Sequence, residues 1–353
     1  MKRILAAIFV ACIVVAVAFA YIHHRHVEAQ RQAFDASSPI FANTPAAVNE
    51  ALPRPSTPDL TQQLPGGAHA VVFADMVTLR ASSFANELAS LAPTPEQDPS
   101  YSEFVRATGF DYSRDLDRVA VALWPQASPT SVLALAQGRF DEAKIERYAL
   151  RSGRRLKING AYVYEVRAQN SPRLVRFAFL NPHEIALADG PAISRVLGPE
   201  RIRLDPPMAA RAAAVSRAPI YLVARTQDLS KDLGIDASKS AQLARLLSSV
   251  HAITAAGQPA GKNLNVSASA ECDSTVDAFE LSTTLQGLLW MGRAALADPK
   301  TQQQIGPQWP ALEAVLKAAD ISHDSNFVRL RLQLTPQMLH VATASSANGT
   351  SQR

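Results

Sequence analysis

The 353-residue chain is 47% hydrophobic and 19% charged, a balance typical of globular proteins and sufficient for one large domain or two small ones. Formal net charge is +4, and Arg supplies 27 of the 35 basic residues because only 8 are Lys. These basic residues are spread along the chain and aromatic residues make up 7%, a pattern that argues against nucleic acid as a partner. The two cysteines, Cys12 and Cys272, are too few for a disulfide within the folded body or for a cysteine metal cluster.

An uncharged apolar segment, Ile4–Ile22, follows two basic residues at the start of the chain. At 1.5 Å per helical residue it spans about 28 Å, close to the thickness of a bilayer's hydrocarbon core. Residues 1–22 are therefore expected to form a signal-anchor helix in a bacterial inner membrane, with the N-terminus cytoplasmic and the body periplasmic. The alternative is a cleaved signal peptide, for which residues 18–20 (Ala-Phe-Ala) offer a cleavage site, and the mature protein would then be secreted.

Residues 23–64 are rich in Pro and small polar residues and poor in large apolar ones, so they are predicted to be a disordered linker. Residues 343–353 are predicted to be a disordered tail. Between them lies an extracytoplasmic body, residues 65–342.

The first half of the body begins with a predicted buried strand, followed by two short helices and a pair of strands; their ranges are 70–76, 82–92, 99–109, 117–124 and 131–140. Asp141 then caps a predicted helix that ends before Gly153. Two hairpins follow, at 156–166 around Asn159-Gly160 and at 174–190.

The second half repeats this order weakly, with predicted strands and helices at 218–226, 240–250, 263–272, 273–297, 309–321 and 326–334. On the helix 273–297, Leu281, Leu285, Leu288 and Gly292 form a stripe along one face. Three pairs of segments are similar between the halves, among them 175–180 and 328–334. The expected fold is thus α+β, a mainly antiparallel sheet with helices on one face, built from two related halves at 65–207 and 208–342.

Recognisable catalytic motifs are absent from the sequence, which contains no G-x-S-x-G elbow and no S-x-x-K. His183-Glu184 resembles the start of a zinc-protease motif, but Leu187 stands where the second histidine ligand is needed. The segment 257–263 lacks the spacing of a phosphate loop. The sequence therefore predicts no catalytic, cofactor-binding or metal-binding residue, and no cofactor.

Two surface features are weaker candidates for binding. Arg151, Arg154 and Arg155 belong to the densest basic run, which suits an anionic lipid or polymer but also the end of a solvated helix. Trp290 and Met291 lie on a helix that is apolar almost all round. They are interpreted as core residues, or else as part of a groove for a lipid or a partner helix.

The stretch "GFDYSRDLD", residues 109–117, places three carboxylates within seven residues. A calcium loop needs a central Gly and a closing Glu, which this stretch lacks. It is better interpreted as a joint, in which Gly109 ends a helix, Phe110 packs inward, and Asp111 caps a short turn.

Residues 68–155 resemble a family of uncharacterised bacterial envelope proteins with an N-terminal anchor. The shared pattern is a helix, the joint, two strands and a Gly-x-Phe-Asp helix start, here at Gly109, Phe110, Asp111, Asp115, Gly138, Phe140 and Asp141. The resemblance implies a fold and a location in the cell envelope, and no activity.

The leading hypothesis is a non-enzymatic, membrane-tethered binding or scaffold domain whose partner is an envelope protein, lipid or polymer. The alternative is a cell-envelope hydrolase with a scattered site that uses Asp111, Asp115, His183 or Asp189. The two hypotheses differ in what they require of the structure. A hydrolase needs two of these carboxylates and His183 around one cleft, whereas a binding domain is indicated by scattered carboxylates and a long apolar groove along 278–297.

Overall fold

The computed structural model describes residues 59–91, 99–124, 131–167, 174–198, 203–226, 241–305, 309–336 and 338. The predicted anchor, the linker up to residue 58 and the tail lie outside these ranges. Among the helices that the structure describes, none is both long enough and apolar enough to span a bilayer.

The first half contains η1 (Leu60–Gln63), β1 (Ala70–Asp75), α3 (Met76–Arg80), α4 (Ser83–Leu91), α5 (Pro99–Thr108), α6 (Tyr112–Asp115), β2 (Leu116–Trp124), β3 (Ser131–Gly138), α7 (Glu142–Ala149), β4 (Arg154–Ile158), β5 (Ala161–Arg167), β6 (Leu174–Asn181), β7 (Glu184–Asp189) and η3 (Gly190–Arg195). The second half contains α8 (Pro206–Val215), β8 (Ile220–Arg225), α10 (Ala241–Ser248), β9 (Val250–Ala260), β10 (Asn263–Cys272), α11 (Thr275–Leu296), α12 (Pro299–Ile305), α13 (Trp309–Ala318), β11 (Asp320–Asp324) and β12 (Phe327–Leu334).

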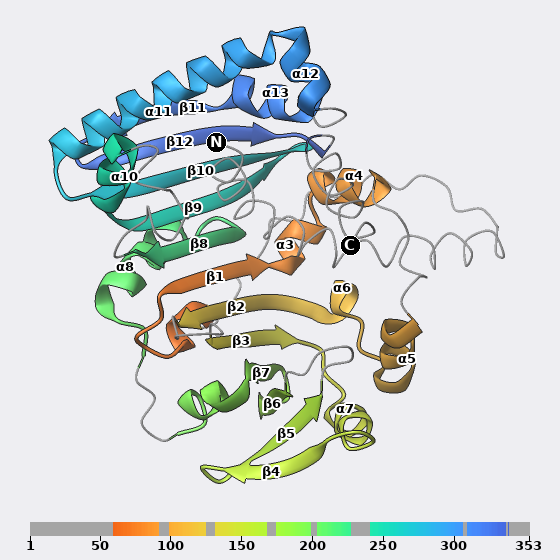
Figure 1. The fold of residues 1–353 in the computed structure, drawn as a ribbon. Coiled ribbons are helices and arrows are strands. Elements are labelled where there is room, and N and C mark those ends of the chain that lie inside the picture. The colour runs from red at the N-terminus through yellow and green to blue at the C-terminus, as the bar shows by residue number, and fades with distance from the viewer. Residues whose placement is uncertain are drawn as a thin grey trace, which may run out of the picture.

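All these strands join one sheet, in the order β11-β12-β10-β9-β8-β1-β2-β3-β7-β6-β5-β4 (Figure 1). Every neighbouring pair is antiparallel, which confirms the predicted α+β class with an antiparallel sheet. At the centre β1 pairs with β8, so the first strands of the two halves lie side by side.

The strand order on the two sides of the centre follows one scheme. In each half the first strand precedes a hairpin (β2–β3 or β9–β10), and the hairpin is followed by a helix. After one or more further strands, a later strand returns to pair with the second strand of the hairpin. The returning strands are β7 and β12. The match of 175–180 with 328–334 is therefore wrong, because it equates β6 with β12. Common ancestry of the halves stays a prediction.

Helices cover both faces of the sheet, so the prediction that they lie on one face is wrong. Val71 and Phe73 of β1 belong to a core that contains residues of η1, η3 and α8. Ala74 of the same strand faces the second core, with residues of α3, α4, α7 and α13. Successive side chains of a strand point to opposite faces, so the two cores lie on opposite sides. The central strands are apolar on both faces, and each face therefore needs a covering layer.

The folded body also begins earlier than the predicted boundary at residue 65. Leu60 and Leu64 of the expected linker are at most 1% exposed, and Thr61 is buried as well. The Thr61 hydroxyl lies 3.1 Å from the Tyr221 hydroxyl of β8 at the centre of the sheet. Two leucines among prolines and glutamines give little periodicity, so the sequence did not distinguish this segment from the linker before it.

Candidate functional site

The residues of the pattern that runs from Gly109 to Asp141 meet at one joint, although 32 positions separate the first from the last. Gly109 has a φ of +71°, and Asp111 is the N-cap of α6, where its Oδ1 accepts from the Ser113 N–H at 3.0 Å. The Phe110 ring stacks on Phe140 with centroids 5.0 Å apart. Asp141 caps α7 by accepting from the Lys144 N–H. These contacts fix α5, β2, β3 and α7 relative to one another, which is a structural role.

Asp115 is the central charge of this joint and is only 6% exposed. One oxygen accepts from the Asp111 N–H at 2.9 Å and from Arg114 at 2.7 Å, and the other lies 3.3 Å from Arg139. Burial by itself would raise the pKa of Asp115. The hydrogen bonds from Arg114 and Asp111, together with the charges of both arginines, outweigh burial and hold the pKa below its ordinary value.

Gly109→Val is expected to lower the free energy of unfolding by about 2 kcal/mol, because a β-branched residue strongly disfavours a positive φ. An added Cβ would meet no close neighbour, since the nearest atom to it is the Lys144 Nζ at 3.9 Å. Asp111→Asn is the matched control, because an amide oxygen also caps the helix, and it should change the stability little. Urea unfolding followed by circular dichroism measures the free energy of unfolding of both variants. Equal values for the two would contradict the structural role assigned to Gly109.

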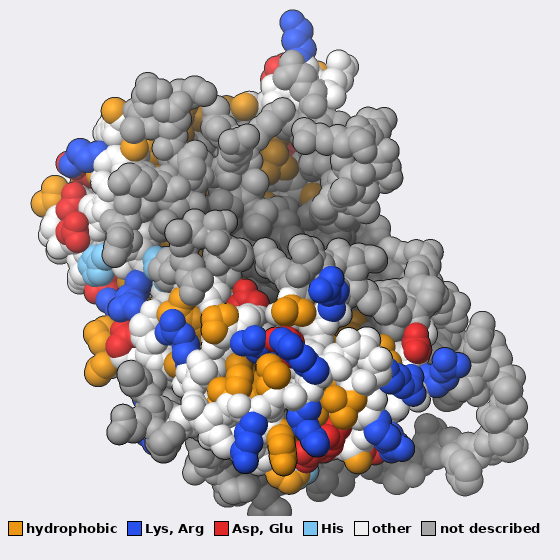
Figure 2. Space-filling view, turned by 60° about the horizontal axis from the view of Figure 1, so that its bottom comes forward, with side chains coloured by type: hydrophobic (Ala, Val, Ile, Leu, Met, Phe, Trp, Pro, Cys, Tyr) orange, Lys and Arg blue, Asp and Glu red, His pale blue; other side chains and the backbone are white. Residues whose placement is uncertain are grey.

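The basic run does not form a free cationic patch. Arg154 and Arg176 both donate to Glu165, at 2.7 and 2.8 Å. Hydrogen bonds from Arg176 and then Arg154 hold the pKa of this carboxyl below its usual range. Arg155 lies 3.0 Å from Glu146, and Arg151 lies 3.8 Å from Glu103. Figure 2 shows many Lys and Arg side chains over this side of the molecule, interleaved with hydrophobic ones and with fewer acidic ones.

The residues of the hydrolase alternative are not brought together. Asp111 and Asp115 belong to the joint, and Asp189, at the far end of β7 from His183, accepts from the Val132 N–H at 2.8 Å. His183 alone of the four lines the cleft over β1, β2, β3 and β7. Groups of three or more His, Cys, Asp or Glu side chains able to hold a metal ion are absent from the part of the chain that the structure describes.

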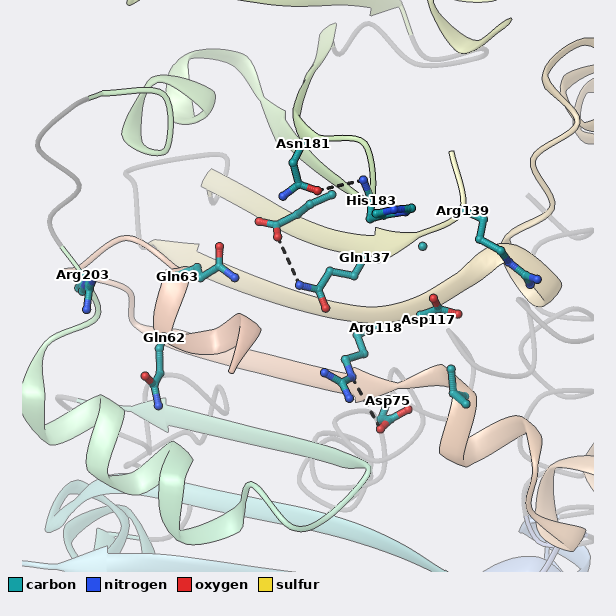
Figure 3. A pocket seen from close by; sticks show the side chains of 13 residues that line it. Gln62, Gln63, Asp75, Asp117, Arg118, Gln137, Arg139, Asn181, His183 and Arg203 are labelled. Carbon is teal, nitrogen blue, oxygen red and sulfur yellow. Dashed lines mark hydrogen bonds and ion pairs between the residues drawn. The ribbon is translucent and has the colours of Figure 1, made fainter. Parts of the chain in front are cut away.

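The cleft has a volume of about 990 Å³ and lies on the sheet face that η1 covers (Figure 3). A row of register partners crosses it. Asp75 of β1 pairs with Arg118 of β2, Arg118 with Gln137 of β3, and Gln137 with Glu184 of β7. Sequence reasoning missed this row, because its members are spread over 110 positions and only the strand register aligns them.

Helix α11 presents the second candidate surface. Its inner face contributes Ala278 and Leu281 to a core with α10 and β12, and partly buried Leu285 and Leu288 of the predicted stripe pack against that core. On the outer side Val276, Phe279, Trp290 and Met291 are 62%, 55%, 70% and 50% exposed. Trp290 and Met291 are thus surface residues, and the core interpretation of them is wrong. Phe279 and Val276 were not singled out from the sequence.

Comparisons with known proteins give little beyond this geometry. No protein-family model and no curated protein matches the chain. Among solved structures, crystal form III of TP0453 is 12% identical, covers 82% of this chain and 100% of its own, and has a TM-score of 0.48. Crystal form I is 11% identical, covers 82% and 99%, and also has a TM-score of 0.48. Similarity at this level carries no information on activity, ligand or partner.

Proposed function

We propose that this chain is a membrane-tethered, extracytoplasmic binding protein without catalytic activity, and that the outer face of α11 docks onto an apolar surface of a partner protein. The observation that carries the proposal is the exposure of Val276, Phe279, Trp290 and Met291 on one side of a single helix. Large aromatic and Met side chains at this exposure are characteristic of protein interfaces, where Trp in particular contributes much of the binding energy.

The four side chains share one side of the helix. At 100° per residue, Val276, Phe279 and Trp290 fall within about 60° of one another, and Met291 lies another 60° from Val276. Thr283, Gly287 and Ala294 lie between and beside them and are small and uncharged. The result is a mainly apolar strip on the side opposite Leu281 and Leu285, with bulky residues near both ends. Glu280, at about 40° from Val276, is the one charged residue of α11 within this arc.

The charged residues of α11 are already engaged elsewhere. Glu280 lies 2.5 Å from Arg245 of α10. Arg293 donates to the carbonyls of Leu316 and Ala319, at 2.8 and 2.9 Å, and so points toward α13. Helices that lie on anionic membranes instead carry many Lys and Arg beside their apolar face, and α11 contains no Lys. A protein surface therefore fits this face better than lipid headgroups do.

The tether rests on the segment 4–22, whose predicted helix would hold the body at the membrane. The linker from 23 to the first folded residues is about 36 residues long and, as a flexible coil, would have a mean end-to-end distance of about 33 Å. The body would then stay near the membrane while α11 remains free to meet a partner.

A photo-crosslinking amino acid placed at Trp290 tests this proposal in the full chain in its native membranes. We expect one discrete protein adduct at this position. Tyr162, which is 56% exposed on β5, is the matched control position and should give none. Val276→Glu, about 21 Å away along the helix, should weaken capture of that protein at least thirtyfold, in line with loss of about 2 kcal/mol at a hot spot.

Val276 suits this test because it lies in the first turn of α11, where a carboxylate is favourable for the helix. Equal crosslinking at positions 290 and 162, or adducts that Val276→Glu leaves unchanged, would overturn the proposal. Binding of the purified chain to protein-free vesicles, with the same sensitivity to Val276→Glu, would instead make this face a lipid surface.

A further inference from the structure

The floor of the cleft contains a buried acid that lacks a cationic partner among the described residues. Glu184 is 4% exposed. Among the described residues, its carboxylate accepts one hydrogen bond, from the side-chain amide of Gln137 at 3.3 Å. No Lys, Arg or His side chain of the described ranges forms an ion pair with it. Buried carboxylates are costly unless a cation or several donors compensate them.

Of the other charges around the cleft, all but Arg203 have partners among the described residues. Arg118 lies 3.9 Å from Asp75, its neighbour in the row, and Arg139 lies 3.3 Å from Asp115 of the joint. Asp117 lies 3.6 Å from Arg80. Arg203, at the opposite side of the cleft in Figure 3, is exposed to solvent, which screens its charge. Glu184 is thus the buried charge in this site that still needs compensation.

The row also limits the shape of a ligand. Neighbouring strands are about 4.8 Å apart, so the three steps from Asp75 to Glu184 cover about 14 Å. Along this length the carboxylates of Asp75 and Glu184 offer acceptors and the guanidinium of Arg118 offers donors. The amide of Gln137 can both donate and accept. The Asn181 side chain lies beside Glu184 in the register of β6 and β7 and also lines the cleft.

We propose that this cleft binds a ligand that carries a protonated primary amine, with the ammonium group donating to Glu184 and adjacent polar groups bonding to Gln137 and Arg118. An ammonium supplies three donors and the missing positive charge, and a charge-assisted bond of this kind is among the strongest available to a protein. The volume of about 990 Å³ accommodates a ligand of several residues or sugar units. This site lies in the first half and is separate from the α11 surface.

Two sources of the amine, an amino sugar and a lysine-type side chain, are distinguished by the choice of probes. Calorimetric titration of the full chain in detergent uses the trimer of glucosamine and the tripeptide Gly-Lys-Gly. The matched controls are the same two molecules with every amine acetylated, including the N-terminal amine of the tripeptide. We expect one amine probe to bind saturably and its acetylated form to bind at least tenfold more weakly, because acetylation removes the charge.

Glu184→Gln keeps the side-chain shape and should weaken binding of the amine probe at least tenfold, since a bond to a charged group contributes at least that much. Arg203 lines the same cleft, and Arg203→Gln removes a positive charge from it. This variant should therefore not weaken binding of the amine probe. Val276→Glu should leave amine binding unchanged, which separates this inference from the proposed function.

Three results would overturn the inference. They are no saturable binding of either amine probe, equal binding of the acetylated forms, and full affinity in Glu184→Gln. The acetylation comparison uses the unaltered protein, so it remains decisive if a variant fails to fold.

Discussion

Gly138→Ala is expected to lower the free energy of unfolding by about 3 kcal/mol, the upper part of the usual range for overpacking. A Cβ at this position would lie 2.3 Å from the backbone oxygen of Asp115 and 3.2 Å from the Cα of Leu116. Neither atom belongs to a flexible side chain, so the backbone of the joint would have to move.

The backbone around Asp115 has little freedom to make room. Its carbonyl accepts from the Arg139 N–H at 2.8 Å, and the Gly138 N–H donates to the His183 carbonyl at 3.0 Å. The β2–β3 register also shifts between Leu116 and Arg118, which leaves Asp117 as the extra residue of a bulge. Relief of the clash would therefore break hydrogen bonds on both sides of Gly138.

Gly287→Ala is the control for this substitution. Gly287 lies within α11 and an added Cβ meets no atom within 4 Å, so alanine should stabilise the helix by up to about 1 kcal/mol. Chemical unfolding of both variants measures the difference. A Gly138→Ala protein as stable as the parent would show that the close approach of β3 to the joint is not required.

Asp115→Asn is expected to lower the free energy of unfolding by about 2 kcal/mol at pH 7. The amide keeps the size of the side chain but removes the charge that Arg114 and Arg139 neutralise. Asp117→Asn is the matched control two residues away. Its carboxylate is 43% exposed and lies 3.6 Å from Arg80, and surface pairs of this kind contribute less than about 1 kcal/mol.

The loss in Asp115→Asn should depend on pH in a defined direction. Because the pKa of Asp115 is lower in the folded protein, its ionisation favours folding above the unfolded-state pKa of about 3.9. That contribution decreases as the pH falls through the folded-state pKa. The stability difference between parent and variant should thus be largest near neutral pH and shrink below about pH 4. A difference that stays constant from pH 7 to pH 3 would contradict this assignment.

Local sequence determined much of the secondary structure. The Asn159-Gly160 pair forms the expected hairpin turn, with φ of +50° and +85°, because these residues tolerate the left-handed region. Asp141 and Asp111 cap helices because their short side chains reach the first free N–H groups. Antiparallel pairing followed from consecutive hairpins. All these features depend on residues a few positions apart, so a single sequence contains the information.

The tertiary structure decided the rest. Helices on both sheet faces, the burial of Leu60 and Leu64, and the exposure of Trp290 and Met291 each depend on which distant segments pack together. An apolar residue has the same transfer preference at the surface and in the core, so composition alone did not separate the two. Likewise Glu184 and Gln137 belong to one site only because antiparallel register places β7 beside β3. The two residues are 47 positions apart, and no local sequence pattern indicates that they are neighbours in space.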